Sequence, residues 1–158
     1  MDNVNIIRPG FFAPTFELSD TDGKKVSLAF FSGERTVFLI FFPALKEKEI
    51  QDFLKAFQEK LKQIKLKGGV VLGISSASRR ELRQEKEKLK VDFPLLFDEN
   101  ALVISQYGVM DTHSGKALCY PALFVVSIDG LIGFRRVWIE KDYLPELKKI
   151  LLGLDELV

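Results

Sequence analysis

The chain has 158 residues, of which 47% are hydrophobic and 28% charged, so it fits one globular domain that buries about two-thirds of its unfolded surface. Its 23 basic and 22 acidic residues give a net charge of +1, so charge gives no reason to expect nucleic acid or an anionic membrane as a partner. No stretch reaches the roughly 18 apolar residues of a membrane-spanning helix, and the first residues lack the pattern of a secretory signal.

Cysteine and histidine each occur once. Cys119 is the only cysteine, so no disulfide can form within the chain, and a lone thiol without a secretory signal predicts a reducing, cytoplasmic location. His113 has no second histidine or neighbouring cysteine with which to bind zinc, and we interpret it as an exposed loop residue. We therefore expect neither a metal nor another cofactor.

The first half of the chain alternates strand and helix patterns. Residues 16–28 alternate around an Asp-Thr-Asp-Gly turn, which predicts a β-hairpin. The apolar run of residues 36–42, ended by Pro43, is typical of a strand buried on both faces. Apolar residues spaced three and four apart predict a helix over residues 46–66. A second buried strand follows at 70–74, and then a charged helix to about Lys90, with Ser76 or Ser78 as its N-cap.

The second half ends in an antiparallel pair of strands and a helix. The remaining expected elements are a short strand at 94–97, a short helix at 101–107, a polar loop at 109–117, strands at 123–128 and 131–139 around an Asp-Gly turn, and a helix at 142–152. This order predicts a single α/β domain with a mixed central sheet and helices on both faces.

Several segments resemble the peroxiredoxin family, the group of alkyl hydroperoxide reductase and thiol-specific antioxidant proteins. They are PGFFAPTFELSDTDGKKVSL, VVLGISSAS, FPLLFDENALVISQYGV and PALFVVSIDGLIGFRRVW, in the family's order and spacing. The resemblance covers roughly residues 8–152. It implies a thioredoxin-like fold with an N-terminal β-hairpin extension, and it implies antioxidant, peroxide-reducing oxidoreductase activity.

The resemblance also places the family's active-site motif, P-x-x-x-[TS]-x-x-C, at the start of the first helix. Pro43 is present, but an ungapped match puts Glu47 at the Thr position and Ile50 at the Cys position. A match on the helix pattern moves the Cys position to Lys46, where the first cysteine of thioredoxin would also fall, with Glu49 at the second. The corner that these residues form therefore lacks a thiol in every register.

A second departure lies before the third strong strand. Peroxiredoxins usually carry an Arg there, whereas this chain has Tyr120 and Pro121. Pro121 resembles the cis-proline of thioredoxin. A cis Tyr120–Pro121 bond would be a local feature facing the helix start, and the sequence leaves open whether this bond is cis or trans.

Each candidate residue has a functional and a structural interpretation. Cys119 is either a relocated nucleophile, with Lys46 as a cation across the corner, or an inert buried thiol. The group of Lys46, Glu47 and Glu49 is either an acid–base cluster or a solvated helix start.

The aromatic residues have structural interpretations. Trp138 is interpreted as a strand residue with solvated basic neighbours. Six phenylalanines are expected chiefly in the core, and any that are exposed could form a homodimer face: Phe11, Phe12, Phe30, Phe31, Phe41 and Phe42.

Two hypotheses for function remain. In the first, the protein is a peroxiredoxin-family member that has lost the Cys, Thr and Arg of its corner and uses the scaffold to bind a protein partner or a subunit. In the second, it is an atypical one-cysteine peroxidase that uses Cys119. A peroxidase needs an activated thiolate, and this requirement favours the first hypothesis.

Overall fold

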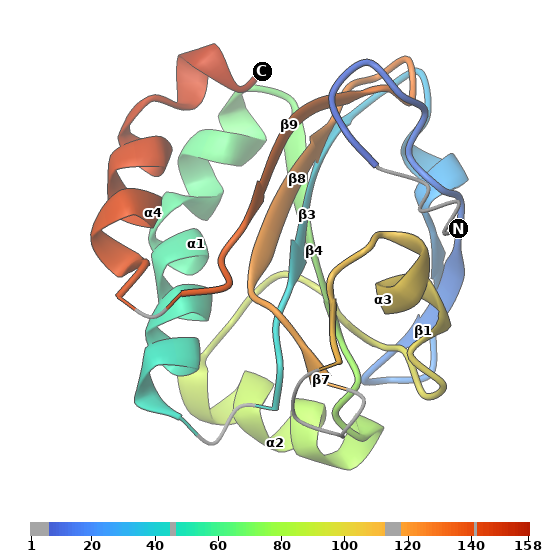
Figure 1. Ribbon diagram of the computed structural model, residues 1–158, viewed down its shortest axis with the longest axis vertical. Coiled ribbons are helices and arrows are strands. Elements are labelled where there is room, and N and C mark those ends of the chain that lie inside the picture. The colour runs from blue at the N-terminus through green and yellow to red at the C-terminus, as the bar shows by residue number, and fades with distance from the viewer. Residues whose placement is uncertain (1–6, 45–46, 113–117, 141) are drawn as a thin grey trace.

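A computed structural model of the chain describes residues 7–44, 47–112, 118–140 and 142–158. Its centre is a seven-stranded mixed sheet in the order β2-β1-β5-β4-β3-β8-β9 (Figure 1). The strands are β1 (Glu17–Asp20), β2 (Lys25–Ser27), β3 (Thr36–Phe41), β4 (Gly69–Ser75), β5 (Leu95–Phe97), β8 (Ala122–Val126) and β9 (Ile132–Val137). β4 pairs in parallel with β3 and with β5, and the other pairs in the sheet are antiparallel.

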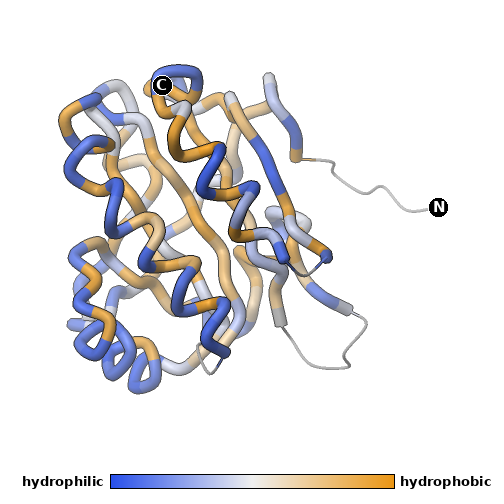
Figure 2. The backbone as a smooth tube through the Cα atoms, turned by 90° about the vertical axis from the view of Figure 1, so that its left-hand side faces the viewer, coloured by the Kyte–Doolittle hydropathy of each residue, from blue (hydrophilic) through white to orange (hydrophobic). Residues whose placement is uncertain are grey.

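Helices cover both faces of this sheet, as expected. Residues of α1 (Lys48–Leu66), α2 (Arg79–Leu89) and α4 (Leu144–Leu152) pack into the apolar cluster on one face. The short helix α3 (Leu102–Gln106) packs into the cluster on the other face. In Figure 2 the strands form an apolar layer behind helices whose hydropathy alternates along their length. Two 3₁₀ turns complete the helical elements: η1 (Leu28–Phe31) and η2 (Leu154–Glu156).

Strand β3 is buried on both faces, as its apolar run predicts. Every residue from Val37 to Phe42 is at most 2% exposed. Alternate side chains point to opposite faces of a strand. One set belongs to the cluster under α1 and α4 and the other to the cluster under α3, so this single strand supplies the centre of both cores.

Helix caps and boundaries follow the expectations closely. Ser78 caps α2, because its hydroxyl accepts a hydrogen bond from the Glu81 N–H at 3.2 Å. The short helix α3 begins one residue later than expected, after Ala101 in the left-handed region, and the Asp98 carboxylate accepts from the Ile104 N–H at 2.8 Å. None of the helices in the described ranges is both long and apolar enough to cross a membrane.

The prediction of a loop over residues 109–117 is wrong at its start. Strand β6 (Met110–Asp111) pairs with β7 (Leu118–Cys119) in a separate two-stranded ribbon. The Tyr120 N–H extends this pairing by donating to the Val109 carbonyl at 2.9 Å. Strands of two residues are too short to show a repeating apolar pattern, so the sequence offers no signal for them. His113 lies outside the described residues.

The aromatic residues divide between core and surface. Phe41 and Phe42 are fully buried, as expected, and Phe31 is half-buried. The core assignment is wrong for Phe11, Phe12 and Phe30, which are 46%, 75% and 77% exposed. Phe11 and Phe12 lie before the hairpin, and Phe30 lies in η1.

Candidate functional site

A hollow of about 530 Å³ lies where β3 ends and α1 begins. Both of these ends are at the lower end of the sheet in Figure 1. We call the hollow the corner pocket. Seven of the eight residues that the sequence places at the corner line it: Pro43, Glu47, Glu49, Ile50, Cys119, Tyr120 and Pro121. The eighth, Lys46, lies outside the described residues. The fold thus brings residues of the first helix and residues some 70 positions later together around one cavity.

The start of α1 delivers carboxylates to the corner pocket. The chain leaves the sheet at Pro43, which has no N–H to continue the strand pairing. Glu47 is the N-cap residue of α1, but its side chain makes no capping hydrogen bond. Glu49 lies in the first turn, where negative charge suits the helix dipole. Its carboxylate accepts from the Asp142 N–H at 3.2 Å and so links α1 to the segment before α4.

Cys119 lines the corner pocket but belongs to the core. It lies in β7 opposite Met110, is 3% exposed, and packs in the apolar cluster on the α3 face. Burial raises the pKa of its thiol far above the ordinary value. The Asp98 and Asp111 carboxylates raise it further, against a backbone hydrogen bond that lowers it. The nucleophilic thiolate is therefore strongly disfavoured at neutral pH.

The Tyr120–Pro121 bond, which the sequence left open, is trans, unlike the cis-proline of thioredoxin that Pro121 resembles. The Tyr120 N–H donates to the Val109 carbonyl, and the Pro121 carbonyl accepts from the Trp138 N–H, both at 2.9 Å. These two bonds hold the dipeptide in a continuous path from β7 into β8. Pro121 still faces the helix start across the corner pocket, as the sequence comparison with thioredoxin suggested.

Trp138 and Tyr143 form an aromatic wall of the corner pocket that the sequence did not indicate. Their rings stack at 5.6 Å between centroids, and Phe53 of α1 packs edge-on against both. The Tyr143 hydroxyl is buried without a hydrogen-bond partner among the described residues. Burial raises the pKa of Tyr143, and the Glu49 and Glu47 carboxylates raise it further. These carboxylates make the electrostatic potential at this wall of the pocket negative.

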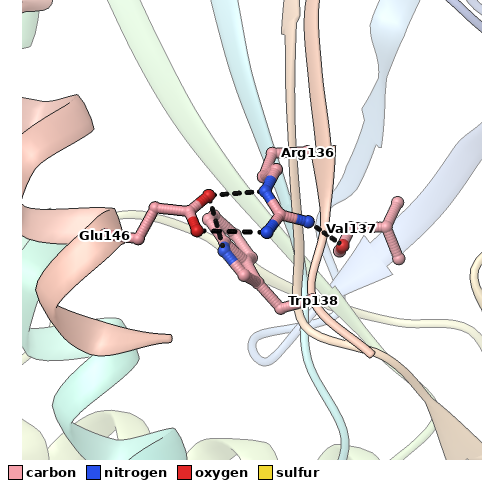
Figure 3. Close-up of polar contacts among 4 residues, drawn as sticks. All are labelled: Arg136, Val137, Trp138 and Glu146. Atoms are coloured by element: carbon pink, nitrogen blue, oxygen red, sulfur yellow. Dashed lines mark hydrogen bonds and ion pairs between the residues drawn. The ribbon is translucent and has the colours of Figure 1, made fainter. Parts of the chain in front are cut away.

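Trp138 is buried one residue beyond the end of β9, so its assignment to the strand is wrong, and Figure 3 shows its polar contacts. Arg136 forms two hydrogen bonds with the Glu146 carboxylate of α4, and the Trp138 indole N–H donates to the same carboxylate at 3.3 Å. The Arg136 guanidinium also lies 5.6 Å from the centre of the Trp138 ring. The expectation of solvated basic neighbours is thus wrong for Arg136, which is held between β9 and α4. No local pattern in the sequence signals a pairing across ten positions.

The charged side chains in the described lining of the corner pocket are all acidic. Its described lining contains carboxylates of Glu47, Glu49, Glu81, Asp111 and Glu140, and it contains no Lys, Arg or His. A low thiol pKa needs a positive neighbour or a helix N-terminus beside the sulfur. The described lining supplies the opposite charge.

Comparison with known proteins connects this geometry to a family. The model of the AhpC/TSA family matches residues 9–135. The chain belongs to the AhpC/TSA family. Peroxiredoxin Bcp of Escherichia coli (strain K12) is 32% identical over 133 residues, which cover 82% of this chain and 85% of the relative. The chloroplastic peroxiredoxin Q of Suaeda salsa is 31% identical over 140 residues, which cover 89% of this chain and 63% of that protein.

Solved structures share the fold of this chain. Peroxidoxin BcpB of Mycobacterium tuberculosis matches with a TM-score of 0.81 at 23% identity, covering 94% of this chain and 97% of that chain. A Xylella fastidiosa PrxQ mutant matches with a TM-score of 0.80 at 17% identity, covering 98% of both chains. The thioredoxin-like fold of this AhpC/TSA member is thus shown, including its N-terminal hairpin. Its only cysteine, Cys119, lies outside the helix start at which the family carries its active-site thiol.

Proposed function

We propose that this AhpC/TSA-family protein is not a peroxidase and that it uses the corner pocket to bind a partner. The observation that carries the proposal is the burial of Cys119, the only thiol in the chain. Peroxide reduction needs a thiolate that can reach the substrate oxygen. The Cys119 thiol is only 3% exposed, so peroxide has little access to it. Its strongly raised pKa also disfavours the thiolate that the reaction needs.

The corner pocket has the features of a binding site rather than a reaction site. Its volume of about 530 Å³ lies within the range of roughly 300–1,000 Å³ that is common for ligand pockets. Trp138 and Tyr143 give one wall of it aromatic character, and its described carboxylates favour a cationic group over an anionic one. Lys46 and Lys141, which stand next to Glu47 and Glu140 in the sequence, lie outside the described residues.

The second candidate is an atypical one-cysteine peroxidase, and one observation favours it. Cys119 borders the corner pocket, so a local opening of the β6–β7 ribbon would bring its sulfur to the cavity. In this mechanism the thiolate takes one peroxide oxygen and becomes a sulfenic acid, while the rest of the peroxide leaves as water or alcohol. An added thiol then reduces the sulfenic acid through a disulfide.

Peroxide consumption separates the two candidates. We expect the native protein and Cys119→Ser to consume hydrogen peroxide with dithiothreitol at the same rate, equal to the rate without protein. We also expect Cys119 to react with a disulfide reagent only after denaturation. A Cys119-dependent rate well above background would contradict the non-catalytic proposal and support the second candidate.

The binding part of the proposal has its own test, because Trp138 is the only tryptophan and lines the corner pocket. We expect benzylamine, an aromatic cation, to change the Trp138 emission with a saturating curve, and benzoate, the matched anion, to change it much less. Glu140→Gln should weaken the benzylamine effect. No saturable change with either compound would contradict a binding pocket, and a preference for benzoate would contradict its negative charge.

A further inference from the structure

The segment before β1, the 3₁₀ turn η1 and the turn between β8 and β9 lie at the end of the sheet opposite the corner pocket, at the upper right of Figure 1, and they carry exposed apolar residues. Phe11, Phe12, Phe30 and Ile128 are 46%, 75%, 77% and 45% exposed. They are four of the nine large hydrophobic residues that are exposed in the described part of the chain. We call the surface that these four residues form the aromatic face. Contiguous exposed apolar patches usually mark an interface.

Backbone hydrogen bonds hold the segments of the aromatic face side by side. The Ala13 N–H donates to the Gly130 carbonyl at 2.9 Å, which fixes the segment carrying Phe11 and Phe12 against the β8–β9 turn. The Gly33 N–H donates to the Ile128 carbonyl at 2.8 Å, which fixes the end of η1 against the same turn. Backbone hydrogen bonds therefore connect the three segments of the aromatic face: the one before β1, the one at the end of η1 and the β8–β9 turn.

A hollow of about 360 Å³ opens between these segments. The buried residues Leu28, Val37 and Val126 line it, together with Phe12 and Phe31. Phe30 stands beside the hollow without lining it, with its ring edge-on to the Phe31 ring at 5.4 Å. The aromatic face thus carries both an apolar hollow and a projecting aromatic side chain next to it.

The hollow also has one positive and one negative residue. Arg35 and Asp129 both line it, and within the described ranges neither forms an ion pair. A surface with a hollow, a projecting ring and both signs of charge can match itself when one copy is rotated by a half turn. A two-fold interface requires such self-complementarity, because the same surface of both protomers forms it and each residue pair occurs twice.

We propose that the aromatic face is the contact surface of a homodimer in which Phe30 of each protomer enters the hollow of the other. The rotation brings Arg35 of one protomer toward Asp129 of its partner, so both charges gain a counter-ion that they lack within one chain. The aromatic rings bury apolar area while the charges fix the register. This proposal is independent of the corner pocket, which lies at the other end of the sheet and stays open in the dimer.

Sedimentation at several protein concentrations tests the apolar contact. We expect the native protein to sediment as a dimer at micromolar concentration. Because each substitution counts twice in a two-fold interface, Phe30→Ser should raise the dissociation constant on the order of 100-fold. Phe12→Ser should act in the same direction. The matched control is Ile139→Ser, a 68% exposed residue at the corner pocket, which should leave the dimer intact.

Charge exchange tests the register of the two protomers. Arg35→Asp places two carboxylates opposite each other across the interface, and Asp129→Arg places two guanidinium groups there. Each single variant should weaken the dimer by about tenfold, and the double variant should restore it, because the opposite charges then meet again in exchanged positions. Circular dichroism should show native secondary structure in every variant, since the substituted side chains are at the surface.

Three outcomes would overturn the proposal. The first is a native protein that stays monomeric up to the highest concentration measured. The second is a dimer that persists in both phenylalanine variants, or that Ile139→Ser dissociates instead. The third is a double charge variant that is weaker than both single variants, which would show that the two residues do not face each other.

Discussion

At the scale of single residues, the surroundings of a side chain decide its chemistry. Cys119 is the residue type that the family's reaction needs, and it lies beside the right cavity. Its burial and the carboxylates of Asp98 and Asp111 raise the pKa of its thiol, which disfavours the thiolate. Residue identity and position thus do not by themselves set the pKa of a thiol, because the thiolate is stabilised by a positive or polar environment.

Gly73 shows the same dependence on surroundings in the core. It pairs with Ile40 in the sheet, and a Cβ there would lie 2.9 Å from both Leu95 Cδ2 and Phe42 Cε1. Both neighbours are fully buried and cannot yield without disturbing the core. We expect Gly73→Ala to lower the free energy of unfolding by about 1–3 kcal/mol, measured by urea denaturation.

Gly133→Ala is the matched control for this prediction. Gly133 lies in β9, and the nearest atom to its added Cβ would be the Val125 carbonyl oxygen at 3.8 Å, an ordinary contact. The change should leave stability within about 1 kcal/mol of the native value, since alanine also restricts the unfolded chain. Equal losses in both variants would show that the loss comes from replacing a strand glycine in general, and not from crowding at Gly73.

At the scale of elements, side chains near the chain's C-terminal end join a helix to the edge of the sheet. Arg136 of β9 pairs with Glu146 of α4, and the same carboxylate accepts from Trp138 (Figure 3). The hydrogen bond from Arg136 lowers the pKa of Glu146 below its usual 4.5. The link positions Trp138, which forms one wall of the corner pocket.

This link predicts a pH-dependent contribution to stability. The pKa of Glu146 is lower in the folded state than in the unfolded state, so its carboxylate stabilises the fold at neutral pH. The contribution is lost as the pH falls through the folded-state pKa. Because the pair is partly exposed, we expect Glu146→Gln to cost no more than about 1 kcal/mol at pH 7, and less at pH 3.

Thermal unfolding of the native protein and Glu146→Gln at pH 7 and pH 3 measures this difference. Glu59→Gln is the control, since Glu59 is an exposed residue of α1 outside this link. Its effect should be small at both pH values. A Glu146→Gln effect that is as large at pH 3 as at pH 7 would mean that packing, rather than charge, gives Glu146 its role.

At the scale of the whole molecule, one sheet separates two apolar cores. Trp138 belongs to the core under α1 and α4, and Cys119 belongs to the core under α3. Alternate residues of β3 enter both cores, so neither core can lose its packing while the other keeps this strand in place. The two cores should therefore unfold together.

The single tryptophan and the single cysteine allow this to be measured. We expect the urea midpoint of Trp138 fluorescence to coincide with the midpoint at which Cys119 becomes reactive to a disulfide reagent. Reactivity of Cys119 at clearly lower urea would show that the β6–β7 ribbon opens by itself. Such an opening would also provide the access that the one-cysteine peroxidase mechanism needs.

The sequence by itself determined the order of the main strands and helices, the buried character of β3 and the absence of a thiol at the start of α1. These features depend on local periodicity, on turn residues and on residue identity, all of which a single chain displays directly. The family resemblance extended this to a thioredoxin-like fold, and most of the corner residues that it indicated do line one pocket.

Only the tertiary structure decided which side chains are buried, and against which neighbours. The isolation of Cys119, the aromatic wall of Trp138 and Tyr143, and the exposure of Phe12 and Phe30 all depend on contacts between distant segments. The same is true of the ribbon formed by β6 and β7. Burial and electrostatic environment belong to the packed molecule, and they change the chemistry of a residue without changing the pattern of its sequence.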